Sequence, residues 1–174
     1  MPSHSPPPFV GPFDDLPAAL EPDAHLIRRI VENYHGPHLH DLRAAIDLSH
    51  KVEARHSGHP SAPDGLAGLL TETFDHLAAH QAREEAILFP AMLSGMIDFL
   101  PWISDIGGEH DDVRGRLEAL KQTAGGYQAP ADACSTWLEL YGLCGKLDAE
   151  LREHIRLEEE VLFPRFAQRL RELR

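Results

Sequence analysis

Apolar residues recur along most of this chain at the spacing of amphipathic α-helices, three and four positions apart. The pattern predicts four long helices, over residues 23–56, 64–92, 106–124 and 132–169. Turn-forming residues separate them, in the run SGHPSAP at 57–63, at Gly125 and Gly126, and at Pro130. Four long amphipathic helices joined by short loops indicate an all-α fold, an antiparallel up-down four-helix bundle.

Prolines set the limits of this helical domain. Residues 1–22 contain seven prolines, a density that predicts an extended arm ahead of one helical domain over 23–174. Residues 94–105 are predicted to be irregular or briefly helical and to form a lid-like connection over one end of the bundle. Pro37 falls within the first predicted helix and should deform it locally.

Polar residues interrupt the apolar seam of every predicted helix, and they do so in a repeated pattern. The segments HQAREEAILFP (80–90) and HIRLEEEVLFP (154–164) share a histidine, a glutamate four positions later and a Leu-Phe-Pro ending. His35 precedes the first histidine by 45 residues and His110 precedes the second by 44. The chain therefore reads as two related helical hairpins that carry His35, His80, Glu84, His110, His154 and Glu158 on their inner faces.

The combination of these six residues predicts a metal centre. Taken singly, each histidine is compatible with a hydrogen-bonded core residue, but two carboxylates in an apolar seam cost several kcal/mol each unless they are paired. No seam lysine or arginine is available to pair with them. His and Glu four positions apart lie on one helix face, so both can reach one ion.

Imidazole and carboxylate ligands suit iron, manganese or zinc, and two carboxylates able to bridge favour a dinuclear redox metal. Iron is the first choice. We expect two iron ions with an oxo or hydroxo bridge, and with an open position for a small ligand such as O2, NO or peroxide.

The remaining histidines are expected to serve elsewhere. On an unbroken first helix His56 would lie about 31 Å from His35, which excludes it from the same centre. His25, His50 and His59 are expected at the surface or in turns. His38 and His40 are best interpreted as solvated side chains, with an entrance to the site as the alternative, and His76 as a possible supporting or replacement ligand.

Charge and composition narrow the function classes. A formal charge of −12 and a pI near 5.4 argue against binding nucleic acid or an anionic membrane surface. No stretch reaches the ~20 apolar residues of a membrane helix, and the first residues lack the order of a signal peptide, which favours a cytoplasmic protein. Cys134 and Cys144, about 15 Å apart on one helix, are expected to be free thiols.

These residues resemble the hemerythrin-like (HHE cation-binding) domain family across roughly residues 24–170. The His-then-Glu order of His80/Glu84 and His154/Glu158 carries the match, and Tyr34-His35, Glu109-His110 and the two Leu-Phe-Pro endings are most similar to the repair-of-iron-centres branch. Many members of that branch carry a cysteine-bearing segment ahead of the bundle, and this sequence shows none. The resemblance implies four terminal histidine ligands and two bridging glutamates.

Three hypotheses for function follow. The first is a di-iron protein that binds or reacts with NO, O2 or peroxide under nitrosative and oxidative stress. It would support repair of damaged iron–sulfur proteins, including by iron donation. The second is a reversible O2 or NO carrier or sensor. The third is a metal-free helical interaction protein.

Overall fold

The computed structural model describes residues 22–95 and 100–172, with the side chains of 100–104 and of Leu170 left outside the description. The predicted arm, apart from Pro22, lies outside the described residues, as does the part of the predicted lid over 96–99. The described residues are almost entirely helical. The all-α four-helix bundle is thereby confirmed.

Three of the four long helices consist of two α-helical parts joined by a π-helical segment. The first comprises α1 (Asp23–Ile30), η2 (Val31–His35) and α2 (Gly36–Arg55), and the second α3 (Leu66–Arg83), η3 (Glu84–Leu88) and α4 (Phe89–Ser94). The third is α5 (Leu100–Thr123), followed by the short 3-10 turn η5 (Gly125–Tyr127). The fourth comprises α6 (Ser135–Leu157), η6 (Glu158–Leu162) and α7 (Phe163–Glu172).

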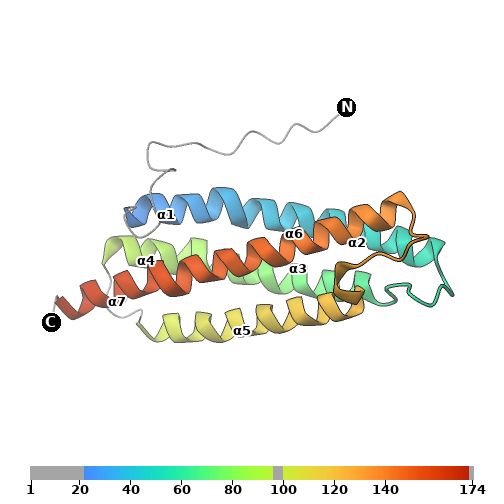
Figure 1. Cartoon of the computed structure of the whole chain (residues 1–174). Helices are drawn as coiled ribbons and strands as arrows, with labels where there is room; N and C mark the ends of the chain where they lie inside the picture. Colours follow the sequence, from blue (N-terminus) through green and yellow to red (C-terminus); the bar gives the residue numbers. More distant parts are fainter. Residues whose placement is uncertain (1–21, 96–99, 173–174) are drawn as a thin grey trace, which may run out of the picture.

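The four helices lie side by side, each antiparallel to the next along the chain (Figure 1). α2 packs against α3 and α6, and α5 packs against the same two helices, which closes the bundle. α1, α4 and α7 lie together at one end, which we call the α7 end, and the two loops over 56–65 and 124–134 lie at the other. No described helix is both long and apolar enough to cross a membrane.

Each π-helical segment ends two residues before a proline. η2 precedes Pro37, η3 precedes Pro90 and η6 precedes Pro164. Proline has no N–H for the carbonyl four residues earlier, and its ring crowds that carbonyl. A wider π turn relieves this conflict without ending the helix. The deformation expected at Pro37 is therefore present, and the same device recurs at the two Leu-Phe-Pro sequences.

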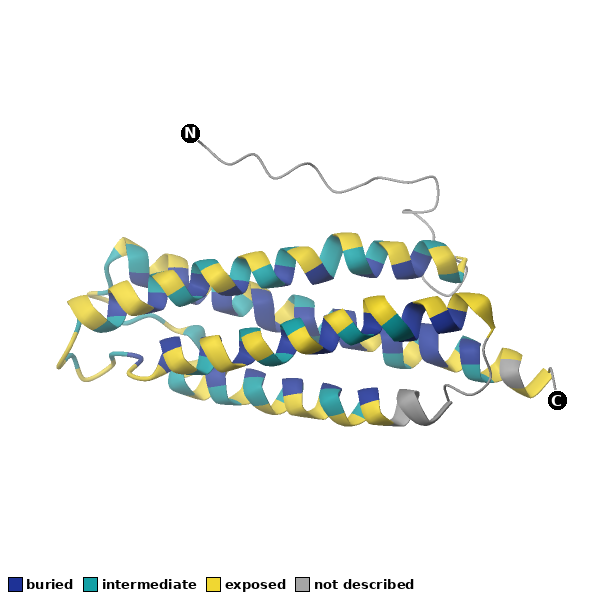
Figure 2. Cartoon of the chain, turned by 180° about the vertical axis from the view of Figure 1, so that it is seen from behind, coloured by how far each residue is buried: buried dark blue, intermediate teal, exposed yellow. Residues whose placement is uncertain are grey.

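The interior of the bundle contains two apolar clusters, visible as buried faces turned toward the axis in Figure 2. The longer one, which we call the long core, fills the loop end and is built around Leu42, Leu70, Leu117, Trp137, Leu140 and Leu151. The shorter one, the short core, fills the α7 end and consists of Leu26, Ile27, Ile30, Leu88, Phe89, Met92, Ile106, Leu157, Leu162, Phe163 and Phe166. Polar side chains of the seam lie between the two.

Three helices begin at other residues than expected. α5 begins at Leu100, so residues 100–105 continue the third helix instead of forming a separate connection, of which a brief helix was one expected form. α3 begins at Leu66, behind Gly65 with φ 87°, instead of at 64, and α6 begins at Ser135 instead of at 132. The expected stop at Gly125 and Gly126 is confirmed, since both glycines adopt positive φ.

Candidate metal centre

The six sequence-predicted residues meet in the interior. His35, His80, Glu84, His110, His154 and Glu158 are each at most 2% exposed. They form two groups in which one ligand atom per residue lies within 4.8 Å of the others: His35 and His154 with both glutamates, and His80 and His110 with both glutamates. Each glutamate belongs to both groups, as two metals sharing carboxylates would require.

The histidines turn their Nε2 atoms inward. His35 Nε2 lies 3.3 Å from His154 Nε2 and 3.5 Å from a Glu84 oxygen. His110 Nε2 lies 3.1 Å from Glu158, and His80 Nε2 lies 3.3 Å from Glu84. Imidazole nitrogens that converge on one another and on carboxylates at these distances are arranged as a set of metal ligands would be.

Local helix geometry explains this convergence. His80 and Glu84, and likewise His154 and Glu158, are four residues apart and therefore share one helix face. Each glutamate is the first residue of a π-helical segment, and His35 is the last residue of another. Single π turns are frequent at functional sites because they re-aim side chains without breaking the helix.

Burial and neighbouring side chains together shift the pKa values of the buried residues. Burial and the neighbouring Glu158 carboxylate raise the pKa of Glu84 well above its ordinary value. At Glu158 burial acts in the same direction, but contacts with His154 and His110 outweigh it and lower the pKa. Burial lowers the pKa of His80 to about 4 and also lowers that of His35, so both imidazoles are neutral near pH 7.

The polar atoms of the site fit a pair of metal cations. Both oxygens of Glu84, one oxygen of Glu158 and Nε2 of His110 are buried without a hydrogen bond from any described residue. A buried carboxylate without positive charge beside it is costly. Cations between the two groups would engage these same atoms and offset the repulsion of the two glutamates.

Three carboxylates hold the outer nitrogens of the histidines. Glu85 lies 2.7 Å from His35 Nδ1, Glu109 lies 2.7 Å from His80 Nδ1, and Glu159 lies 3.0 Å from His110 Nδ1. A carboxylate that accepts from Nδ1–H fixes the tautomer with Nε2 free to bind a metal and raises its basicity. Helical spacing alone did not indicate this role, although the doubled glutamates of the two repeats were a signal for Glu85 and Glu159.

Aromatic rings close the site toward the α7 end. The ring of Phe89 stacks on His35 with centroids 5.9 Å apart, and Phe163 stacks on His110 at 6.1 Å. Both phenylalanines come from the Leu-Phe-Pro sequences and belong to the short core. The repeated motif thus supplies a buried glutamate that faces the other histidines, an apolar cover and the proline that follows each π turn.

Three other histidines near the site lie outside the two ligand groups. His38, expected to be solvated, is instead fully buried, and its ring lies 5.6 Å from that of His154. The expectation was wrong because His38, three residues after His35 and four before Leu42, shares their inner face and packs against His154 of the fourth helix. His40 is exposed as expected, and His76 is half-buried outside both groups.

His56 lies at the opposite end of the bundle. Its Nε2 is 3.1 Å from Cys134 Sγ, and its ring packs on Trp137, a residue of the long core. The distance argument that excluded it from the centre is consistent with this position. Cys134 and Cys144 are both free thiols, as expected.

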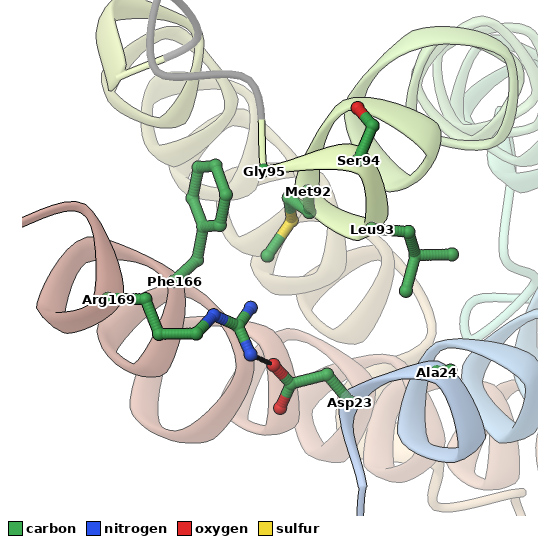
Figure 3. A pocket seen from close by; sticks show the side chains of 8 residues that line it. All are labelled: Asp23, Ala24, Met92, Leu93, Ser94, Gly95, Phe166 and Arg169. Atoms are coloured by element: carbon green, nitrogen blue, oxygen red, sulfur yellow. Dashed lines mark hydrogen bonds and ion pairs between the residues drawn. The ribbon is translucent and has the colours of Figure 1, made fainter. Parts of the chain in front are cut away.

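A cavity of about 420 Å³ at the α7 end is not part of the centre. Figure 3 shows that its walls come from the start of α1, the end of α4 and α7. Its acidic side chain, Asp23, is engaged by Arg165 at 3.0 Å and by Arg169. The two His-Glu groups lie in the interior between the helices, and none of their residues lines this cavity.

Comparison with known proteins identifies the family. The model of the hemerythrin HHE cation-binding domain matches residues 26–166 of the 174. The chain belongs to the hemerythrin HHE cation-binding domain family. The family resemblance inferred from the His-Glu repeats is thus confirmed, and the buried His and Glu groups are compatible with the cation binding for which this family is named.

Characterised relatives are iron–sulfur cluster repair proteins. The chain is 40% identical over 145 residues to the iron-sulfur cluster repair protein YtfE of Citrobacter koseri, which covers 83% of this chain and 66% of that protein. The proteins of the same name from Escherichia coli and Escherichia fergusonii are 39% identical over the same length. This chain thus spans about two thirds of the length of these relatives.

Proposed function

We propose that this HHE domain holds a non-haem di-iron centre that binds or reacts with NO, O2 or peroxide and supports the repair of iron–sulfur centres under nitrosative and oxidative stress. The observation that carries the proposal is the pair of buried four-residue groups that share Glu84 and Glu158. In this proposal two iron ions carry an oxo or hydroxo bridge. The names of the relatives support the repair role.

Each protein group has a distinct part in this function. His35 and His154 would hold one ion, His80 and His110 the other, and the two glutamates would be shared. The bound iron would supply redox chemistry and an open position for a small ligand. Glu85, Glu109 and Glu159 keep the imidazoles in the tautomer that presents Nε2. The two stacked phenylalanines limit the entry of water to the site from the α7 end.

Iron analysis tests the centre directly. The chain loaded with ferrous iron without oxygen and then exposed to air should retain two irons and show absorption of an oxo-bridged pair. Glu84→Ala and Glu158→Ala should each lose most of the iron, because each removes a ligand of both ions. His56→Ala, at the far end of the bundle, should retain it. Equal loss in all three variants, or less than one iron in the unmodified chain, would contradict the proposal.

A second measurement separates repair from carriage. The iron-loaded chain is mixed with an iron–sulfur enzyme whose cluster has been broken by NO, and the activity of that enzyme is followed. Recovery that requires the loaded chain, and that exceeds recovery with the same amount of free ferrous iron, supports repair. Stable, reversible O2 or NO binding with no recovery would favour the carrier or sensor. The cytoplasmic location and the damaged iron–sulfur partner remain predictions.

A further inference from the structure

The two halves of the centre are related by the internal repeat, which allows a position-by-position comparison. The repeat aligns His80 with His154, and it aligns His35 with His110 as the lone histidine of each hairpin. Each ligand group takes one histidine of each kind, so the group of His35 and His154 corresponds to the group of His80 and His110. Differences around equivalent histidines are then differences between the two ions.

The His80/His110 group is supported on both histidines. Glu109 accepts from His80 Nδ1 at 2.7 Å and is itself held by Arg83 at 2.7 Å. Glu159 lies 3.0 Å from His110 Nδ1 and is held by Arg114. Each imidazole is thus oriented by a carboxylate, and each carboxylate is oriented by an arginine.

The His35/His154 group lacks most of this support. Glu85 contacts His35 Nδ1 at 2.7 Å, but this carboxylate is 45% exposed. Nδ1 of His154 is buried and has no hydrogen bond among the described residues. Its neighbours are rings: Tyr34 stacks on it with centroids 5.4 Å apart, and His38 lies 5.6 Å away.

The sequence differences behind this asymmetry fall at equivalent positions. Tyr34 precedes His35 where Glu109 precedes His110. Leu39 and Leu157 stand at the positions that correspond to Arg114 and Arg83. One half of the repeat therefore has neutral side chains at the three positions where the other half has a carboxylate and two guanidinium groups.

We propose that the ion held by His35 and His154 is bound more weakly than its neighbour and is the one that this domain exchanges with its surroundings. A carboxylate behind a ligating histidine increases its basicity and fixes its ring, and removing one typically costs about 10–100-fold in metal affinity. His154 has none. The inference rests on the proposed di-iron function and assigns iron donation to one half of the centre.

Release kinetics provide the test. The full chain is loaded with two equivalents of ferrous iron without oxygen, and transfer to an excess of a coloured ferrous chelator is followed. We expect two phases of one iron per chain each, separated by about tenfold or more. Crystals of the chain loaded with one equivalent of cobalt(II), analysed by anomalous scattering, should show the ion between His80 and His110, which requires no variant.

Matched variants assign the phases. Glu109→Gln should accelerate release of the slowly released iron by about 10–100-fold, so that the two phases merge or change order while one iron still leaves at the original fast rate. Tyr34→Glu should slow the fast phase by about tenfold, because it places a carboxylate beside His154. Tyr34→Phe, which keeps the stacked ring, should change neither phase. Helical circular dichroism identifies any variant that fails to fold.

The outcomes are distinct. Release of both irons in one phase from the unmodified chain, a cobalt ion between His35 and His154, or a Glu109→Gln chain that still releases one iron at the original slow rate would overturn the proposal. A chain that takes up no iron at all fails at the loading step and overturns the di-iron function itself. A further outcome is that the two irons leave in two phases that respond to the variants as expected while a damaged iron–sulfur enzyme fails to recover. That result would support the difference in binding between the two ions and contradict the repair role.

Discussion

At the scale of single residues, the doubled glutamates divide their work across the helix surface. Glu84 and Glu158 are fully buried and face the other ligands, whereas Glu85 and Glu159, one residue later, contact the outer nitrogens of His35 and His110. Neighbouring side chains on a helix point about 100° apart. The first glutamate of each pair can therefore face the interior of the site while the next one reaches the outer nitrogen of a histidine. One dipeptide thus supplies both a ligand and the group that orients another ligand.

A buried glutamate selected for metal binding should destabilise the metal-free chain. We expect Glu84→Gln to abolish iron binding and to raise the free energy of unfolding of the metal-free chain by about 1–3 kcal/mol, because the amide replaces a carboxyl group that burial and Glu158 make costly to ionise. Chemical denaturation in the presence of a chelator measures this. Glu153→Gln, on the partly exposed face of α6, should change stability by less than about 0.5 kcal/mol and retain the metal. A loss of stability in Glu84→Gln would contradict the argument.

At the scale of the elements, three helices pass through the site without ending there. Each uses a five-residue π turn before a proline, and these turns contain His35, Glu84 and Glu158. The proline and the apolar seam are readable in sequence. The π turn is not, because a straight α-helix satisfies the same three- and four-residue spacing over short distances.

Gly126 and Gly142 have opposite backbone requirements, so replacing each by alanine tests where the third helix ends and that the fourth is continuous. Gly126 adopts φ 70° at the end of the third helix, so Gly126→Ala should destabilise the chain by about 1 kcal/mol. Gly142 is exposed inside α6 with open space around its Cα, so Gly142→Ala should stabilise the chain by about 0.5–1 kcal/mol. Urea unfolding of both variants measures the difference. Shifts of the same sign would contradict the assignment, and iron content should stay unchanged in both.

At the scale of the whole molecule, the centre lies between the long core and the short core and takes ligands from all four helices. In the proposed function, metal binding would join all four helices at a level where the described residues otherwise connect them through contacts of His35, His80 and His110 with carboxylates. The short core is the smaller cluster, and the ligand-bearing π turns lead directly into it. It should depend more on the metal than the long core does.

Metal removal should accordingly lower stability. A ligand that binds only the folded chain stabilises it by about 2.7 kcal/mol at a concentration 100 times its dissociation constant. For a domain of this size we expect removal of iron to lower Tm by about 5–10 °C. Hydrogen exchange should accelerate most in α1, α4 and α7 and least around Trp137. An unchanged Tm, or exchange that accelerates first at the loop end, would contradict this arrangement.

The sequence by itself determined the four helices, the bundle class and the six inward polar residues, because helical periodicity and the His-Glu repeat are local properties of the chain. That the six residues ligate iron stays a prediction. Tertiary structure alone decided which histidine meets which carboxylate across the bundle, the burial of His38 and the unequal surroundings of His80 and His154. These depend on contacts between helices far apart in sequence, which helical spacing does not encode.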